Sequence, residues 1–281
     1  MDRLGPLLGQ PFASAADVVA AGSDRVHENA FLMGRACRLL GFDADFAPCV
    51  DLGLRIPGEV LVAGRTFGFH AEDVVVAGIV FLHGLARAGI ASCLKHFPGL
   101  GRALADTHNE LPVVDAHDVD LMVTDFAPFT RLAPIADGVM VAHAAYPDLS
   151  GQVVPASLSP EIYAILRGPV RFGKAVFSDD LNMAALPGPL SDRAARAAAA
   201  GCDVLVVSRP GDAWEESIRK VRQAEERDQD ARGRERRLRT FRERCSAAPR
   251  PAFTSLAWDD LSAAVAAFNE LLAQPREIRA I

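Results

Sequence analysis

Short apolar stretches of strand length alternate along the chain with longer segments in which apolar residues recur every three or four positions. The strand-like stretches are residues 44–52, 90–94, 138–142, 175–178 and 204–207. The helix-like segments are residues 24–40, 73–88, 118–132, 158–166 and 192–200. Strands rich in Val, Ile and Leu that are joined by helices are typical of a parallel sheet buried on both faces. The pattern therefore predicts an α/β fold.

Ionisable residues follow four of the predicted strands at the point where each strand ends. They are Asp51, Lys95, His96, His143, Asp179 and Asp180. In parallel α/β folds the active site is built at the carboxyl ends of the strands, so we expect these side chains to share one site. Gly99-Leu100-Gly101 lacks the third glycine of the dinucleotide-binding fingerprint, which argues against a nucleotide-dependent oxidoreductase.

Composition narrows the class of protein. The 281 residues are 50% hydrophobic and 23% charged, so the chain can bury a large core. The net charge of −6 provides no positive field for a polyanion, so no nucleic-acid partner is expected. No apolar stretch approaches the roughly 20 residues of a membrane span, and the first residues lack the features of a secretory signal. These observations predict a cytoplasmic protein with no membrane partner.

The five cysteines are widely spaced and include no C-x-x-C pair. They are Cys37, Cys49, Cys93, Cys202 and Cys245. Because four of them lie in apolar segments, we expect reduced core residues rather than disulfides or a zinc site.

The first candidate for chemistry is the segment Lys95-His96-Phe97-Pro98-Gly99-Leu100-Gly101, which is followed by Asp106-Thr107-His108. A strand that ends in Lys and His and enters a Pro/Gly loop places polar groups at the mouth of a pocket. A core histidine beside a surface lysine is the alternative. Asp106 can orient the His108 ring and raise its basicity, but an ordinary loop hydrogen bond explains this pair equally well.

The second candidate is Ser178-Asp179-Asp180-Leu181. Adjacent carboxylates repel each other, so we expect one to face the site as nucleophile or base and the other to cap a helix or pair with a cation. The alternative is that both are caps. Arg65 has a planar guanidinium that suits a hydroxyl-rich or carboxylated ligand, although by itself it has the pattern of a surface arginine.

These motifs together resemble glycoside hydrolase family 3, and specifically its bacterial β-N-acetylhexosaminidases. The matching segments are Lys95 to Gly101, Asp106 to His108, Ser178 to Met183, Phe46 to Asp51, Gly64 to Phe67, Val139 to His143, Pro155 to Ser157 and Ala200 to Asp203. The resemblance implies a (β/α)8 TIM-type barrel, a retaining mechanism, and no cofactor or bound metal. It places the nucleophile at Asp179, the acid/base at His108 and its orienting carboxylate at Asp106. It also implies sugar binding by Arg3, Arg65, Lys95 and His96.

Two features depart from the family pattern. Leu100 occupies the position of a family histidine, which removes a polar side chain from the loop. Five strands are predicted where a closed barrel has eight, and Met1-Asp2-Arg3-Leu4 resembles the end of a sugar-binding motif that follows the family's third strand. We therefore expect residues 1–281 to form one barrel domain that is incomplete at its N-terminus. Residues 212–281 are its charged helical C-terminal part, with a solvated helix pair broken at Gly233.

The expected function is removal of terminal β-linked N-acetylglucosamine from cell-wall muropeptide fragments, with a small carbohydrate as the binding partner. One alternative is a non-catalytic sugar-binding remnant. Another is a metallohydrolase in which His96, His108, His143 and Asp179 bind zinc. The pattern does not indicate an oligomeric state.

Overall fold

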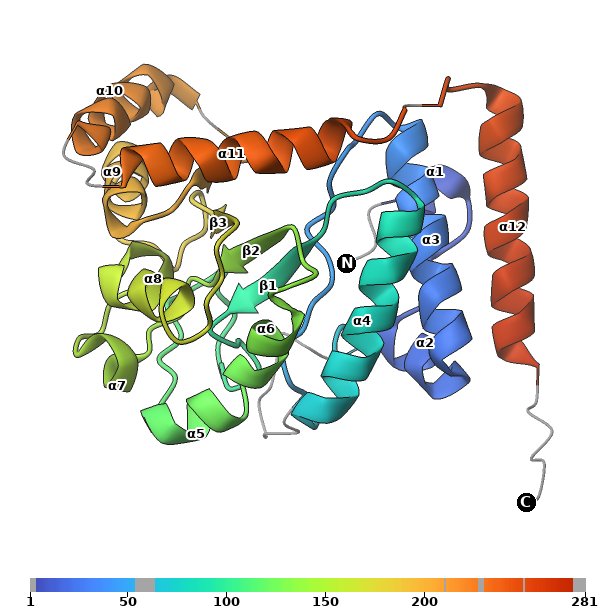
Figure 1. Cartoon of the computed structure of the whole chain (residues 1–281), viewed down its shortest axis with the longest axis horizontal. Helices are drawn as coiled ribbons and strands as arrows, with labels where there is room; N and C mark the ends of the chain where they lie inside the picture. The colour runs from blue at the N-terminus through green and yellow to red at the C-terminus, as the bar shows by residue number, and fades with distance from the viewer. Residues whose placement is uncertain (1–3, 54–63, 210, 227–229, 250, 275–281) are drawn as a thin grey trace.

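The computed structural model describes residues 4–53, 64–209, 211–226, 230–249 and 251–274 (Figure 1). The strands are β1 Cys93–Phe97, β2 Gly138–Val141, β3 Ala175–Asp180 and β4 Val204–Val206. The α-helices are α1 Gly5–Leu8, α2 Ala15–Ala21, α3 Ser23–Leu39, α4 Ala71–Arg87, α5 Asp118–Val123, α6 Phe126–Leu132, α7 Pro147–Ser150, α8 Pro160–Arg167, α9 Leu190–Ala200, α10 Trp214–Glu225, α11 Ala231–Ser246 and α12 Ser255–Ala273. Two short 3₁₀ helices are η1 Ala156–Leu158 and η2 Gly211–Ala213.

The four strands form a parallel sheet in which spatial order follows sequence order, β1-β2-β3-β4. Consecutive strands joined by helical crossovers are the arrangement of an α/β barrel, whereas a doubly wound sheet reverses direction partway. Helices α4, α6, α8 and α9 lie around the outer side of the sheet (Figure 1). The α/β prediction is therefore confirmed.

The prediction of a regular strand over residues 44–52 is wrong, although this segment does run beside β1. Two isolated parallel bridges join it to the sheet, Ala44 to Ala91 and Cys49 to Lys95. The carbonyls of Ala47 and Pro48, which are adjacent in sequence, accept the backbone N–H groups of Cys93 and Lys95. This shift interrupts the ladder, and Pro48 has no N–H with which to restore it.

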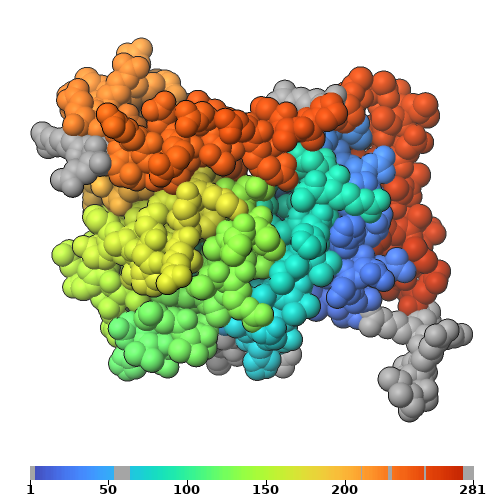
Figure 2. Space-filling model, in the orientation of Figure 1, coloured from blue at the N-terminus to red at the C-terminus, as the bar shows by residue number. Residues whose placement is uncertain are grey.

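Helix α11 lies across the amino ends of the strands, at the opposite end of the sheet from Asp179. Its Phe241 ring packs 5.1 Å from the Phe177 ring, on a small apolar cluster formed by the strands. Its Arg244 donates to the carbonyl of Ile90, just before β1, and pairs with Asp137, just before β2. Figure 2 shows α11 as a band along one edge of the molecule, between α10 and α12.

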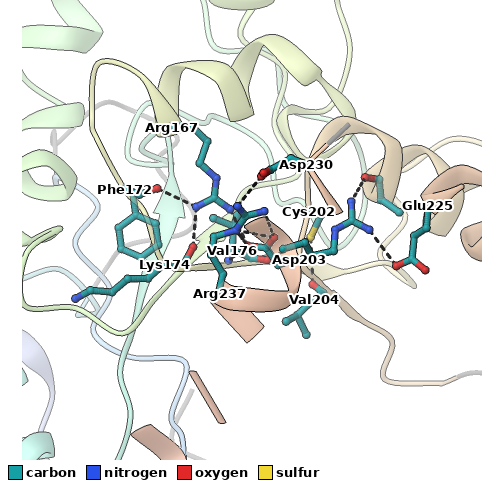
Figure 3. A network of polar contacts seen from close by, with 12 residues as sticks. Arg167, Phe172, Lys174, Val176, Cys202, Asp203, Val204, Glu225, Asp230 and Arg237 are labelled. Carbon is teal, nitrogen blue, oxygen red and sulfur yellow. Dashed lines mark hydrogen bonds and ion pairs between the residues drawn. The ribbon is translucent and has the colours of Figure 1, made fainter. Parts of the chain in front are cut away.

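A buried ion-pair network fixes α11 to the sheet (Figure 3). The Asp203 carboxylate is fully buried, and it pairs with Arg167 at 2.6 Å and with Arg237 at 2.7 Å. It also accepts the backbone N–H of Val176 in β3 at 2.9 Å. The predicted helix break at Gly233 is wrong, because Gly233 lies inside α11. Much of α11 is solvent-exposed, as predicted, but Arg234 is buried and the Arg237 side chain is only 10% exposed.

Helix α12 covers the N-terminal helices. Its buried side chains are Leu261, Val265 and Phe268. Its polar side chains Ser262 and Asn269 donate to the carbonyls of Leu8 and Pro11, at 2.7 and 2.9 Å. The amphipathic pattern near the end of the sequence thus reflects packing against the first helices. None of the helices in the described part of the chain is long and apolar enough to cross a membrane.

Candidate active site

A buried carboxylate, Asp51, organises the loop that begins at the end of β1. Its Oδ1 accepts the backbone N–H groups of His96 at 3.0 Å and Leu100 at 2.8 Å. Its Oδ2 lies 2.7 Å from Nδ1 of His96 and accepts the Cys49 thiol at 3.1 Å. Burial by itself raises the pKa of Asp51, but the charge and hydrogen bonds of His96, with the Leu100 N–H, hold that pKa below its usual value.

The same loop is held from its other side. The Tyr146 hydroxyl donates to the carbonyl of Gly99 at 2.8 Å, and Arg102 pairs with the buried Asp125 at 2.9 Å. Gly101 packs so closely that a Cβ at this position lies 1.9 Å from the Leu52 carbonyl oxygen. Hydrogen bonds to the backbone and close packing therefore fix the loop.

Leu100, at the position of the family histidine, is buried with 2% of its surface exposed. Its backbone N–H still reaches Asp51, so the loop keeps this anchor without a polar side chain at position 100. The replacement of the family histidine by Leu100 therefore removes only side-chain polar contacts and leaves the backbone hydrogen bond to Asp51 in place.

Lys95, His96 and Arg65 are three of the four predicted sugar-binding residues. His96 is buried, whereas Lys95 and Arg65 are half-buried. Burial raises the pKa of Cys49, and the positive charge of Arg65 acts in the opposite direction. The hydrogen bonds of His108 lower the pKa of Asp106, and the charge of Arg65 adds to that effect. Arg65 is therefore close enough to act electrostatically on both Cys49 and Asp106. Arg3, the fourth predicted sugar-binding residue, is outside the described residues.

Asp106 and His108 form the predicted pair. Asp106 Oδ1 accepts the backbone N–H of His108 at 2.9 Å and lies 2.8 Å from Nδ1 of the His108 ring. These hydrogen bonds, led by the one from the backbone, lower the pKa of Asp106. With Nδ1 held by Asp106, Nε2 is the ring nitrogen that remains for proton transfer, and the His108 side chain is 70% exposed.

The pair lies beside the loop that follows β3. The backbone N–H of Ala185 donates to the carbonyl of Thr107 at 3.3 Å, and both residues are buried. This contact brings the Asp106–His108 loop to the segment that leaves β3 just after Asp179 and Asp180. The structure thus brings together two motifs that are about seventy residues apart in the sequence.

The two adjacent carboxylates at the end of β3 have different surroundings. Asp180 accepts the Ser208 hydroxyl and the backbone N–H groups of Ser208 and Asn182. Although burial opposes the shift, these bonds lower the pKa of Asp180. Among the described residues, the hydrogen bond to the Asp179 side chain comes from the neighbouring Asp180 N–H, at 2.8 Å. Hydrogen bonds from two neighbouring residues thus hold the Asp180 side chain, whereas the Asp179 side chain accepts one from the adjacent backbone.

His143, which the sequence placed at a strand end and named as a ligand only in the zinc alternative, supports the end of β3. Its Nε2 donates to the Asp180 carbonyl at 3.0 Å, so its Nδ1 accepts the buried Ser157 hydroxyl at 2.7 Å. Burial lowers the pKa of His143, although the negative charge of Asp179 acts in the opposite direction. The sequence placed Asp51 at the site through its position at a strand end but not as the anchor of the loop, and it did not identify Tyr146 or Ser157.

The four residues of the alternative zinc site do not converge. Both ring nitrogens of His143 are occupied, and His108 is paired with Asp106. Within the described part of the chain, the ligand atoms that cluster belong instead to Cys49, Asp51 and His96. The arrangement therefore lacks the predicted metallohydrolase centre.

Comparison with known proteins identifies the class to which this fold and site belong. The family model described as "Glycosyl hydrolase family 3 N terminal domain" matches residues 10–238. The chain belongs to glycosyl hydrolase family 3, as its motifs indicated.

Two curated relatives and one solved structure show what kinds of protein the chain is similar to. A beta-hexosaminidase of Xylella fastidiosa is 39% identical over 74% of this chain, and the match covers 61% of that protein. A beta-hexosaminidase of Stenotrophomonas maltophilia is 38% identical over 65% of this chain, and the match covers 54% of that protein. The solved structure of a glycoside hydrolase family 3 β-N-acetylglucosaminidase from a Paenibacillus strain is similar to 92% of the chain, with a TM-score of 0.80 and 27% identity, over 52% of that protein. The chain thus spans about half to three fifths of the length of these three proteins.

Proposed function

We propose that this chain carries the catalytic residues of a retaining β-N-acetylhexosaminidase that removes terminal β-linked N-acetylglucosamine. The names of the relatives support the sugar. The observation that carries the proposal is the division of roles at the end of β3, where Asp180 is held by Ser208 and Asn182 and Asp179 is not.

In the proposed mechanism, Asp179 attacks the anomeric carbon and forms a covalent glycosyl-enzyme. His108 protonates the leaving oxygen and then accepts a proton from the water that hydrolyses the intermediate. Asp106 orients the His108 ring and stabilises its cationic form. Lys95, His96, Arg65 and Arg3 hold the hydroxyl and acetamido groups of the sugar.

Cell-wall muropeptide fragments are the proposed source of this sugar, and the cytoplasm is the proposed location. A terminal N-acetylglucosamine joined to a peptide-bearing sugar presents the non-reducing end that this site would hold. Hydrolysis rates of N-acetylglucosaminides that differ only in the aglycone test this source, because the contacts to the N-acetylglucosamine itself are the same in each substrate.

An acid/base role for His108 can be tested with two leaving groups. His108→Ala should greatly slow the cleavage of an unactivated disaccharide, whose leaving group needs a proton. With an activated aryl glycoside, the variant should still form the glycosyl-enzyme but hydrolyse it slowly, so that this intermediate accumulates. Azide should then restore turnover of the aryl substrate by attacking the intermediate without needing a base.

The chain offers a matched control in His117, which is exposed and pairs with Asp148 at 3.1 Å in the same way. His117→Ala should retain wild-type rates with both substrates. Equal losses with both leaving groups in His108→Ala, without azide rescue, contradict the assignment. Sugar binding without turnover by the unmodified chain would favour the non-catalytic alternative.

A further inference from the structure

Three side chains of different chemistry converge beside the loop that follows β1. Cys49 Sγ lies 3.1 Å, and His96 Nδ1 2.7 Å, from the same oxygen, Oδ2 of Asp51. The three potential ligand atoms all lie within 4.8 Å of one another. Thiolate sulfur, imidazole nitrogen and carboxylate oxygen are the donors that zinc takes in proteins.

We propose that Cys49, Asp51 and His96 form a binding site for a zinc-class divalent cation. Three protein ligands leave the fourth position of a tetrahedral ion for water or another small ligand. A site with sulfur and imidazole donors selects Zn²⁺ or Co²⁺ over Mg²⁺ and Ca²⁺, which take oxygen ligands. The proposal concerns binding alone, so it holds whether or not the chain hydrolyses a sugar.

The ion replaces the thiol proton that Cys49 donates to Asp51, because the thiolate is the form that binds a metal. His96 binds as the neutral imidazole with Nδ1 free of its proton and Nε2 protonated, so the metal takes the place of the hydrogen bond between Nδ1 and Asp51. The Asp51 carboxylate and the Cys49 thiolate together carry two negative charges that offset those of the divalent cation.

The two oxygens of Asp51 allow binding without loss of the loop. The metal takes Oδ2, whereas Oδ1 continues to accept the backbone N–H groups of His96 and Leu100. The ion therefore fixes the His96 ring by a metal bond in place of a hydrogen bond. Because the site forms only in the folded chain, binding stabilises the fold.

The test uses the full chain, reduced and metal-free, titrated with Co²⁺. Thiolate coordination produces a charge-transfer absorption that reports the Cys49 bond directly and does not depend on enzyme activity. Competition against a chromophoric chelator then gives the Zn²⁺ affinity, and thermal unfolding with and without Zn²⁺ shows that the ion binds the folded chain. Mg²⁺ serves as the hard-cation control.

The unmodified chain should bind one Co²⁺ with a thiolate band, and affinity should fall with decreasing pH because protons compete. Cys49→Val should lose the band and weaken Zn²⁺ binding by more than about tenfold. Cys245→Val changes another half-buried cysteine and should retain the band, as should His108→Ala. A cooperative melt confirms that each variant is folded, and Cys49→Ser replaces Cys49→Val if the latter does not fold. No band in the unmodified chain, or a band that persists when Cys49 is replaced, overturns the proposal.

Discussion

Asp203→Asn should strongly destabilise the chain, because it removes the carboxylate that joins α11 to the sheet. The Asp203 side chain is 0% exposed, while its partners Arg237 and Arg167 are 10% and 25% exposed. Asparagine keeps one acceptor oxygen but directs its NH₂ group at the guanidinium donors. Arg167 then loses the carboxylate with which it pairs, and Arg237 keeps only its pair with the exposed Asp230. Breaking a buried pair in this way costs about 3–5 kcal/mol of the free energy of unfolding.

The measurement is urea unfolding followed by circular dichroism, with the midpoint and slope determined for each variant. Asp230→Asn is a matched control, because Asp230 pairs with the same Arg237 at 2.6 Å but is 66% exposed. Exposed pairs contribute about 1 kcal/mol or less, so this control should stay close to the unmodified chain. Equal effects of the two substitutions would refute the assigned role of the buried network.

Two further predictions concern the site. Burial holds the pKa of His143 below 6.5, so the free energy of unfolding should fall as the pH drops from 6.5 towards the folded-state pKa. His143→Gln should remove the part of this fall that comes from protonation of His143. If the urea midpoints of the variant keep the pH dependence of the unmodified chain, the prediction is wrong. Gly101→Ala should destabilise by about 1–3 kcal/mol or more, because its Cβ meets the Leu52 carbonyl oxygen, whereas Gly173→Ala, with nothing within 4 Å, should not. Similar midpoints for the two alanine variants exclude the proposed close packing at Gly101.

Most of the sheet could be predicted from the sequence because its strands contain buried apolar runs, such as Gly138–Val141 and the first residues of Ala175–Asp180. The segment over residues 44–52 has the same apolar character, but Pro48 and the adjacent carbonyl acceptors interrupt its ladder. Predicted helix 118–132 similarly divides into α5 and α6, with Asp125 between them pairing with Arg102. Apolar periodicity reports burial but does not show where backbone hydrogen bonding is interrupted.

The arginines of α11 show what a one-dimensional pattern leaves out. A run of charged residues usually marks a solvated face, yet Arg237 reaches Asp203, which is 34 residues away in the sequence. The partner carboxylate precedes a strand and has no local signal. Long-range ion pairs of this kind depend on the arrangement of the elements in space.

The sequence identified most residues of the candidate site but not the hydrogen bonds that join them. The sequence indicated that Asp179 and Asp180 have different roles, and the contacts of Asp180 with Ser208 show which one is held. Asp51 was not identified as the anchor of the loop because its partners His96 and Leu100 lie 45 and 49 residues away. The catalytic assignments themselves remain predictions.

The central claim is that Asp179 forms a covalent bond to the sugar, and trapping of that intermediate tests it most directly. The chain is incubated with an activated fluorinated N-acetylglucosaminide, and the adduct is located by mass spectrometry of the intact protein and its peptides. One adduct per chain, attached to Asp179 and lost in Asp179→Ala, is the predicted result. An adduct on Asp180, or the same adduct in Asp179→Ala, would contradict the account.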